Sequence, residues 1–395
     1  MSEWKECKLE DLAKIQTGPF GSQLHASDYV TVGIPNIMPT NIGQRLDIRT
    51  DQIVYVDPKD IERLKKYKVV ENDIVYSRRG DVEKCAFITE QQDGWLCGTG
   101  CLRIRFSSPQ VLPKFVAYYL STPDIKSWVL NSAVGTTMPN LNSGILTKLP
   151  LRIPEKKIQK QILNTLSSLD DKIDLLHRQN KILEAMAETL FRQWFVEEAE
   201  ESWEVGRLGN VLSVKGGTTP STAIAEYWDG DVNWTTPKDL SNHQGVYMFS
   251  TERKITKSGL TKIGSGLLPV GTVLLSSRAP IGYLAINEIP VAINQGYIAI
   301  ICDKGLSNYF IYSWCKANIE EIKNSGNGSV FQEISKTTFK ELPITIPAVQ
   351  KMEEFDVAIE PVFQKIKSNQ VQIEALTQMR DSLLPKLMSG DLQLN

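Results

Sequence analysis

Two long stretches of the chain carry apolar residues at alternating spacings of three and four, and they are almost free of glycine and proline. They cover about 155–198 and 348–388, and each begins directly after an Ile-Pro pair, a position that favours the start of a helix. The spacing predicts two coiled-coil helices of about 60 Å each. The seam positions are Leu166, Leu169, Ile173, Leu176, Asn180, Leu183, Ala187, Leu190 and Trp194, then Ile359, Val362, Ile366, Asn369, Ile373, Leu376, Arg380, Leu383 and Leu387.

A single helix cannot bury such a seam by itself, so each helix must pack against another part of the chain. Two arrangements are open: each helix lies on its own globular domain, or the two helices pair with each other. We favour pairing. The path of the chain then makes the pair antiparallel, with one globular domain at each end of the rod and a pseudo-twofold axis across its middle.

Two asparagines interrupt the apolar seams. Asn180 occupies an a position of the heptad and Asn369 occupies a d position. In an antiparallel pair a packs near d of the partner, and the spacing places these two residues opposite each other near the middle of the helices. We expect their side chains to meet and to fix register and direction. Two unrelated, solvated asparagines are the alternative.

The segments before the helices, 1–153 and 203–347, are short β-like runs separated by Gly, Pro, Asn and Asp turns, and the second segment repeats the first. The chain is thus two tandem copies of about 195 residues. We predict an α+β fold, with two mixed α/β domains at 1–153 and 203–347 and long helices within 154–199 and 348–395. The matching phrases are "NDIVYSRRG" (72–80) with "GTVLLSSRA" (271–279), "TGCLRI" (99–104) with "QGYIAI" (295–300), and "LTKLPLRIP" (146–154) with "FKELPITIP" (339–347).

Composition narrows the class of protein. With 395 residues and 42% apolar content, the chain is long enough for two folded domains, and it has no apolar run that could span a membrane. It begins with a charged segment rather than an apolar signal core, so we expect a cytoplasmic protein. Six cysteines without a CxxC pair, beside only three histidines, predict free thiols rather than disulfides or a zinc site.

Charge and motifs indicate a binding protein without a catalytic centre. The net charge of −2 gives no overall basic signature, so nucleic-acid binding would have to rest on local features or on partners. The sequence has no phosphate-binding loop, nucleophile elbow or zinc-protease motif. Glu321-Ile322-Lys323 has the spacing of some nucleases, but no convincing acidic partner is visible upstream, and we interpret it as an exposed helix face.

An arginine follows a short apolar run at the same point of both copies, and this turn is the first predicted contact region. Arginine can donate two parallel hydrogen bonds to guanine O6 and N7 or to phosphate, and serine hydroxyls can hold phosphate. We expect the shared arginines, Arg79 and Arg278, to anchor phosphate. Arg78 in one copy and Ser277 in the other would then help the copies read different sequences. A solvated hairpin end is the alternative. The residues proposed here are Ser77, Arg78, Arg79, Lys84, Ser276, Ser277 and Arg278.

A small polar loop late in each copy is the second predicted contact region. "NSAVGTTMPNLNSG" at 131–144 aligns with "NSGNGSVFQEIS" at 324–335, and its side chains can read base edges or hold phosphates. An ordinary turn-rich loop is the alternative. We interpret the basic cluster "IERLKKYK" at 61–68 as a solvated helix end rather than a DNA contact. The loop residues proposed here are Thr136, Thr137, Asn140, Asn142, Asn327, Ser329 and Gln332.

With these features in view, the chain resembles the specificity subunits of type I restriction–modification enzymes, the HsdS family, over essentially all 395 residues. The order and double occurrence of several phrases carry the resemblance. They are "GPFGSQLHASDY" (18–29) and "GGTTPSTAIAEYWDGDVNW" (216–234) as openings of recognition domains, "GTTMPNLNSGILTKLPLRIP" (135–154) as a closing phrase, and "NKILEAMAETLFRQWFV" (180–196) and "MRDSLLPKLMSGDL" (379–392) as the two conserved helices.

The resemblance implies a function. Each globular unit would be a target-recognition domain that reads one half of a bipartite, asymmetric DNA site, and the helices would set the spacer between the halves. Two methyltransferase subunits using S-adenosylmethionine, which methylate adenine N6, would dock on the helices. Motor–nuclease subunits using ATP and Mg would complete the restriction complex. The chain itself would bind no cofactor and hold no catalytic centre.

The chain also departs from the family pattern. The closing proline phrase is usually followed by a glutamate-glutamine pair, whereas Lys160-Gln161 and Glu353-Glu354 stand here, which puts any partner contact of that glutamine in doubt in the second copy. Two other functions stay open from the sequence: a binder of another polymer or a scaffold with duplicated domains, and a self-sufficient nuclease or methyltransferase.

Overall fold

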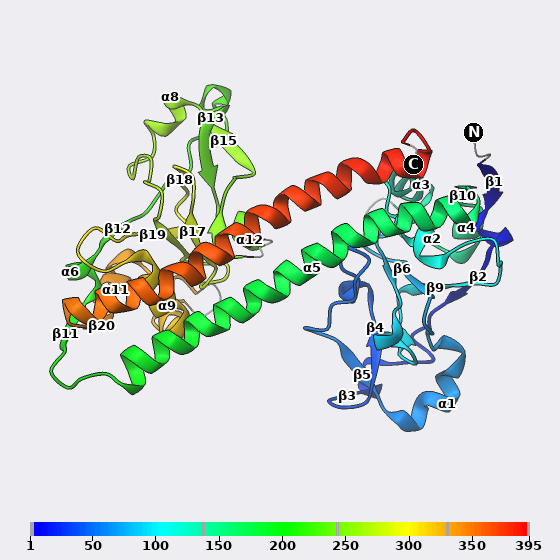
Figure 1. Ribbon diagram of the computed structural model, residues 1–395, viewed down its shortest axis with the longest axis horizontal. Coiled ribbons are helices and arrows are strands. Elements are labelled where there is room, and N and C mark those ends of the chain that lie inside the picture. Colours follow the sequence, from blue (N-terminus) through cyan, green and yellow to red (C-terminus); the bar gives the residue numbers. More distant parts are fainter. Residues whose placement is uncertain (1–3, 136–138, 242, 244, 329–331, 393–395) are drawn as a thin grey trace. The chain divides into compact units, whose positions relative to one another are not determined.

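The computed structural model describes residues 4–135, 139–241, 243, 245–328 and 332–392. The chain forms two compact units, residues 1–172 with 376–395 and residues 173–375. Each unit combines one globular domain with one half of each long helix (Figure 1). The boundary between the units therefore cuts across both helices.

The first globular domain is built from small sheets with the strand orders β1-β10, β2-β9-β6-β7 and β3-β5-β4-β8. β4 and β8 pair in parallel whereas β4 and β5 are antiparallel, so the last sheet is mixed. The strands are β1 (Lys5–Lys8), β2 (Ala13–Thr17), β3 (Tyr29–Val30), β4 (Ile34–Ile37), β5 (Val54–Val56), β6 (Ile74–Ser77), β7 (Cys85–Phe87), β8 (Leu96–Cys97), β9 (Cys101–Phe106) and β10 (Pro150–Ile153). The helices are α1 (Ile61–Leu64), α2 (Pro113–Leu120), α3 (Pro123–Ser132) and α4 (Ser143–Thr147).

The second domain repeats this topology. Its order β12-β19-β16-β17 reproduces β2-β9-β6-β7, and β11-β20 reproduces β1-β10, while β14 extends the larger sheet and β15-β13-β18 forms a separate one. The strands are β11 (Glu204–Arg207), β12 (Ser213–Lys215), β13 (Trp228–Thr235), β14 (Tyr247–Met248), β15 (Arg253–Ile255), β16 (Val273–Ser276), β17 (Leu284–Asn287), β18 (Ala292–Ile293), β19 (Tyr297–Ile301) and β20 (Pro343–Ile346). The helices are α6 (Leu208–Val211), α7 (Pro237–Ser241), α8 (Lys257–Leu260), α9 (Asn308–Ala317), α10 (Ile319–Asn324) and α11 (Lys336–Glu341).

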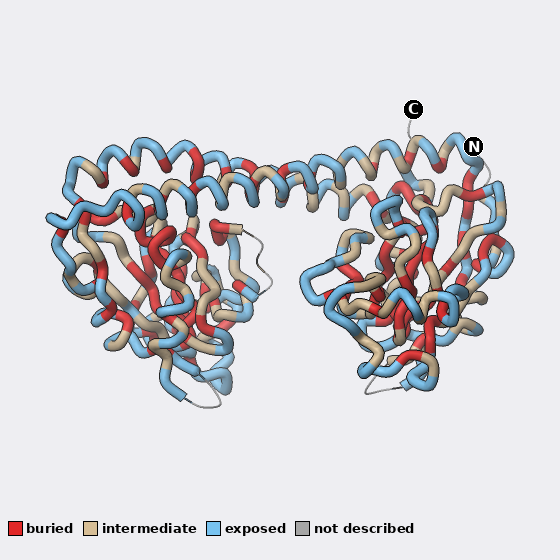
Figure 2. The backbone as a smooth tube through the Cα atoms, turned by 90° about the horizontal axis from the view of Figure 1, so that it is seen from below, coloured by how far each residue is buried: buried red, intermediate tan, exposed pale blue. Residues whose placement is uncertain are grey.

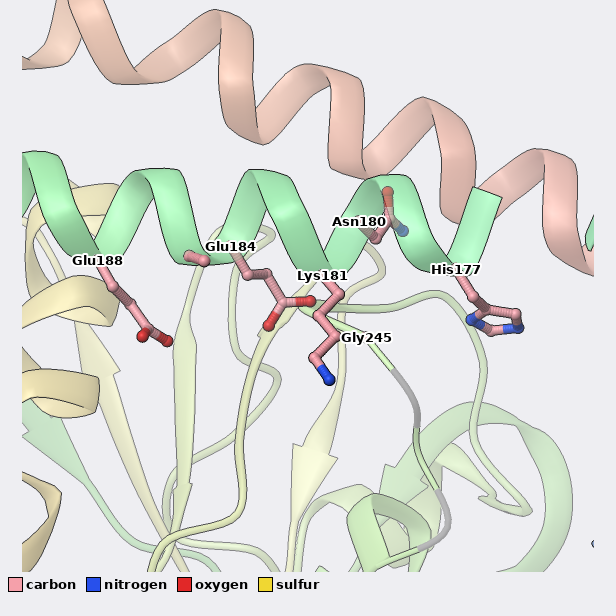
Figure 3. A pocket seen from close by; sticks show the side chains of 7 residues that line it. His177, Asn180, Lys181, Glu184, Glu188 and Gly245 are labelled. Carbon is pink, nitrogen blue, oxygen red and sulfur yellow. The ribbon is translucent and has the colours of Figure 1, made fainter. Parts of the chain in front are cut away.

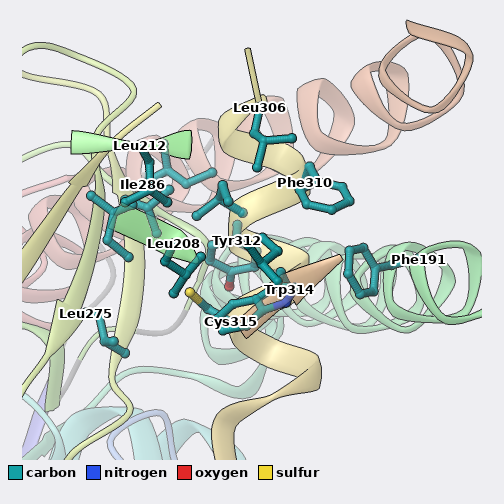
Figure 4. Close-up of a cluster of buried hydrophobic side chains, with 14 of the residues drawn as sticks. Phe191, Leu208, Leu212, Leu275, Ile286, Leu306, Phe310, Tyr312, Trp314 and Cys315 are labelled. Carbon is teal, nitrogen blue, oxygen red and sulfur yellow. The ribbon is translucent and has the colours of Figure 1, made fainter. Parts of the chain in front are cut away.

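The apolar run before each arginine forms an interior strand of a sheet. All four residues of β6 and all four of β16 are buried, as expected for continuous apolar strands covered on both faces. In the second unit the core joins the domain to the long helices. Phe191 lies against Phe310 of α9, with ring centroids 5.3 Å apart (Figure 4). Aromatic pairs of this kind add about 0.5–1.5 kcal/mol beyond the area that they bury.

The long helices are α5 (Lys156–Arg192), followed by a π-helical turn (Gln193–Glu197), and α12 (Val349–Ser389). In the first unit the start of α5 packs with the end of α12, where Asp170 and Arg380 form an ion pair at 3.0 Å. In the second unit the end of α5 packs with the start of α12, where the rings of Phe191 and Phe355 lie 6.3 Å apart. The two helices therefore run antiparallel.

Both helix arrangements considered from the sequence occur together. The predicted seam positions are buried or half-buried, and buried positions recur along α5 and α12 in Figure 2. The same helices also contribute to the domain cores, for example Phe355 and Phe363 in the second unit. Pairing and domain packing thus share the apolar face of each helix.

The two asparagines meet inside the second unit. Asn369 Nδ2 donates to Asn180 Oδ1 at 2.9 Å, and both side chains are buried. The next residue, Gln370, exchanges two hydrogen bonds with the backbone of Tyr247: its Nε2 donates to the carbonyl at 2.6 Å and its Oε1 accepts from the amide at 3.1 Å. These contacts tie α12 both to α5 and to β14. Whether the asparagine pair sets the register stays a prediction.

Candidate nucleic-acid interface

The two arginine turns are residues 77–80 and 276–278. Each closes a β-hairpin, between β6 and β7 in the first copy and between β16 and β17 in the second. The serine that ends the first strand builds the turn. Ser77 Oγ donates to the Arg79 carbonyl at 3.1 Å, and Ser276 Oγ donates to the Pro280 carbonyl at 2.8 Å. Ser77, Ser276 and Ser277 are buried. The two strand-end hydroxyls are thus already used inside the protein, and they position the arginines that follow.

The late polar loop lies directly against the arginine turn in both copies. Arg79 forms an isolated β-bridge with Asn140, and Arg278 forms one with Glu333. The neighbouring amides repeat the match, because Leu141 N donates to the Arg78 carbonyl at 2.9 Å and Ile334 N donates to the Ser277 carbonyl at 3.0 Å. The two contact regions, predicted separately, therefore form one surface in each copy.

The predicted loop residues occupy different positions around this surface. Asn140 is half-exposed, and Asn327 and Gln332 are exposed. Asn142 caps α4, since its Oδ1 accepts from Ile145 N at 2.8 Å, so it has a structural role of its own. Lys84 is half-exposed and forms an ion pair with Asp81. Thr136, Thr137 and Ser329 lie outside the described residues.

A third segment, which the sequence did not suggest as part of the site, reaches the same surface: the glycine phrase that opens each copy. Gly18 N donates to the Cys101 carbonyl at 3.0 Å, and Thr218 N donates to the Ile293 carbonyl at 3.2 Å. A Cβ atom at Gly18 would lie 2.1 Å from the Gly98 carbonyl oxygen, and one at Gly217 would lie 1.8 Å from the Ile293 carbonyl oxygen. Glycine is required at both positions because the backbones approach so closely. The available signal was the repeated phrase itself.

The opening phrase brings a different side chain to the turn in each copy. In the first copy the guanidinium carbon of Arg78 lies 5.2 Å from the ring centroid of Phe20. In the second copy the side chain of Thr219 donates to Gln295 Oε1 at 2.8 Å, and Gln295 is exposed. Gln295 matches Thr99 of the first copy in the aligned phrases "TGCLRI" and "QGYIAI". The two copies therefore share a backbone frame and differ in the side chains that it presents.

Arg78 is held in an unusual environment for a cation. Only 9% of the residue is exposed, and its buried Nε has no hydrogen-bond partner among the described residues. Burial lowers the pKa of its guanidinium, and the neighbouring charge of Arg79 acts in the same direction. The hydroxyl of Thr99 is likewise buried without a partner in the described part of the chain. Arg78 N donates to the Gly100 carbonyl at 2.8 Å, which places the arginine beside the Thr99 segment.

The shared arginines face different neighbours. Arg79 is exposed and lies opposite the neutral Asn140. Arg278 lies opposite Glu333, and its Nη1 is 3.6 Å from Glu333 Oε2 in a partly exposed ion pair. Such exposed pairs contribute little to stability, but the glutamate partly neutralises the arginine at this edge. The first copy thus places two arginines at the turn, Arg78 buried and Arg79 exposed, whereas the second places one, which is already paired.

The basic cluster at 61–68 is largely paired internally. Lys65 forms an ion pair with Glu62, Arg63 forms one with Asp60, and Tyr67 is buried. The opening phrase of the second domain also contacts the segment that follows α8, because Thr218 Oγ1 donates to the Lys262 carbonyl at 3.1 Å. In the β15-β13-β18 sheet, which α8 contacts, the exposed Arg253 stacks over Trp228, with its guanidinium carbon 3.7 Å from the ring centroid.

A cavity of about 370 Å³ lies between α5 and the loop that precedes β14. In Figure 3, His177, Lys181, Glu184 and Glu188 point from α5 toward the domain, whereas Asn180 points toward α12. Burial raises the pKa of the Glu184 carboxyl, and Lys316, 3.9 Å away, opposes that shift. The lining mixes both signs of charge and selects no particular ligand, so we assign it no function.

Metal sites and membrane-spanning helices are both absent from the described residues. Among the described residues, no three His, Cys, Asp or Glu side chains are grouped so that they could hold a metal ion. In the same part of the chain, none of the helices has the length and apolar character needed to cross a membrane.

Comparison with protein families matches residues 1–185 and 200–378 to the type I restriction modification DNA specificity domain. The MjaIX type I restriction enzyme specificity subunit of Methanocaldococcus jannaschii is 36% identical over 191 residues, which is 48% of this chain and 44% of that protein. The HindI type I restriction enzyme specificity subunit of Haemophilus influenzae is 23% identical over 471 aligned positions, which cover 99% of this chain and 100% of the relative.

Among solved structures, the S subunit of a type I restriction-modification system from M. genitalium has a similar fold. It matches with a TM-score of 0.58 and 19% identity over 98% of this chain and 96% of that one. At this level of identity the likeness concerns the fold alone. The family match, in contrast, covers both copies of the repeat.

Proposed function

Because the chain belongs to the family of type I restriction–modification DNA specificity subunits, we propose that each of its two arginine-turn surfaces reads one half of a bipartite DNA site. The chain is the non-catalytic DNA-recognition subunit of such a system. The observation that supports the division into half-sites is that, in each copy, the late loop pairs with the arginine turn through matching backbone contacts. The opening phrase reaches the same surface through side-chain contacts that differ between the copies. Two copies of one frame with different side chains suit two different half-sites.

The long helices would serve the assembly. They would set the spacing between the half-sites and bind two methyltransferase subunits, with motor–nuclease subunits completing the restriction complex in the cytoplasm. On α5, Leu175, Ile182 and Met186 are exposed at spacings that place them on one face, and Val357 and Val371 are exposed in the same way on α12. Exposed apolar rows of this kind are typical of surfaces that bind a partner. Partners would also supply the net positive charge that this chain, with a net charge of −2, does not have.

Mapping of methylated adenines across the genome, with and without the gene for this chain, tests the proposal. We expect one bipartite motif to disappear with the gene. Replacing residues 203–347 by another recognition domain should change one half of that motif and leave the other half and the spacer unchanged. Persistence of every methylated motif after deletion would refute the proposal, as would cleavage or methyl transfer by the isolated chain.

A further inference from the structure

We infer that Arg78, Thr99 and Phe20 form a preformed site in the first domain that reads a guanine of the first half-site. The inference rests on the proposed function, because it assigns the ligand of one of the two proposed surfaces. It concerns the first copy only, since Ser277, Gln295 and Thr219 occupy the matching positions of the second.

The first argument is the unfilled hydrogen-bonding capacity of the site. Arg78 is nine-tenths buried and its Nε has no partner among the described residues, and the same holds for the buried hydroxyl of Thr99. A buried polar group without a partner is costly, and a buried charge is more so. A ligand that brings hydrogen-bond acceptors would remove this cost.

The second argument concerns which acceptors fit. Guanine presents O6 and N7 side by side in the major groove, and an arginine binds both through its planar fork. Phe20 is 55% exposed and its ring centroid lies 5.2 Å from the guanidinium carbon, so the ring limits where that fork can swing. A cation placed only to attract phosphate needs neither burial nor a fixed orientation. The exposed Arg79, next in the chain, is better suited to that role.

The third argument is the difference between the copies. Ser277 is buried, and its carbonyl and amide make the same backbone bonds as those of Arg78. The backbone frame of the turn therefore does not require an arginine at this position. In the second copy the Thr219–Gln295 hydrogen bond joins the two side chains at the positions that match Phe20 and Thr99. An arginine that is buried in one copy and replaced by serine in the other is what we expect of a residue that distinguishes the two half-sites.

The test uses the specificity subunit assembled with its methyltransferase subunits. The methylation map supplies the motif, and the exchange of residues 203–347 identifies the half read by the first domain. That half must contain a G·C pair. Arg78→Ala should lower affinity for the cognate duplex about 10- to 100-fold. Replacing the G·C pair that Arg78 reads should then cause no further loss of affinity in this variant. Arg78→Lys keeps the charge but loses the fork, so it should lose the same discrimination with an unchanged dependence on salt.

Arg79→Ala is the matched control, with the same change of charge one residue away. It should weaken binding to all duplexes alike and reduce the slope of log affinity against log salt by about 1. If Arg78→Ala behaves in this uniform way, Arg78 anchors phosphate and the inference is wrong. It is also wrong if the first half-site lacks a G·C pair or if Arg78→Ala leaves the motif unchanged.

Two milder variants cover the case in which Arg78→Ala prevents folding. Thr99→Val and Phe20→Leu should each reduce discrimination at the same base pair several-fold while the second half-site is read normally. Unchanged discrimination in both, together with an unchanged motif for Arg78→Lys, would overturn the inference. Absence of any bipartite motif in the wild type would instead reject the proposed function itself, so the two failures are distinguishable.

Discussion

The two arginine turns share a backbone and differ in the chemistry placed around it. In both copies a strand-end serine and the late loop hold the turn, and the opening glycine packs against the backbone of a neighbouring segment. The first copy then presents Arg78 and Arg79, whereas the second presents the paired Arg278 and the exposed Gln295. The comparison teaches that the repeat preserves the backbone of the turn and varies the side chains around it, which would allow one fold to recognise two sequences.

The close backbone approach at the opening glycines is the strongest test of the shared scaffold. Gly217→Ala and Gly18→Ala would place a Cβ atom 1.8 Å from the Ile293 carbonyl oxygen and 2.1 Å from the Gly98 carbonyl oxygen, so the opening phrase would have to move away from these carbonyls. We expect each substitution to destabilise its own domain by more than about 2 kcal/mol. Chemical denaturation of the purified chain measures this loss.

Gly21→Ala and Gly264→Ala are the matched controls, because a Cβ atom at either position meets no atom within 4 Å. These variants should unfold at nearly the same denaturant concentration as the wild type. Equal losses in all four variants would mean that the glycines act only through backbone flexibility and that the shared contact is unimportant.

The sequence pattern predicted the scaffold but not which side chains make up the surface. Periodicity located both helices, because a four-heptad seam is a long and regular signal, and the spacing of Asn180 and Asn369 was enough to anticipate their contact. The repeat likewise located both turns. The placement of Phe20 and of the Thr99 segment beside Arg78 was missed because it arises from contacts between segments far apart in the sequence. The burial of Ser77 was missed for the same reason.

The shared arginines test whether the two turns have a common role. The double variant Arg79→Ala with Arg278→Ala should lower affinity for cognate and unrelated duplexes alike, by about 10- to 100-fold at moderate salt. The slope of log affinity against log salt should fall by about 2 for the two lost phosphate contacts. Fluorescence anisotropy across a salt series, with the methyltransferase-bound complex, measures both quantities. Unchanged affinity would mean that the turns are ordinary surface.

Gln295 tests the part of the comparison that belongs to the second copy. Its exposed amide is oriented by Thr219, so Gln295→Ala should weaken cognate binding about fivefold and relax the second half-site only. Thr219→Val, which removes the orienting hydroxyl but keeps the shape, should have a smaller effect in the same direction. Methylation mapping in cells that carry each variant shows which half of the motif changes. A change confined to the first half would contradict the assignment of domains to half-sites.

Glu333 lowers the net charge around Arg278, whereas the neutral Asn140 lies opposite Arg79. Removing the Glu333 charge should therefore make the second turn resemble the first. Glu333→Gln frees Arg278 from a carboxylate 3.6 Å away, so affinity for unrelated duplexes should rise about threefold at low salt. Asn140→Asp introduces the opposite change at the matching position beside Arg79 and should lower that affinity by a similar factor. Glu341→Gln, at a glutamate that pairs with Arg207 instead, controls for the change in net charge. If Glu341→Gln and Glu333→Gln raise affinity equally, the effect is one of overall charge, and the ion pair does not distinguish the two turns.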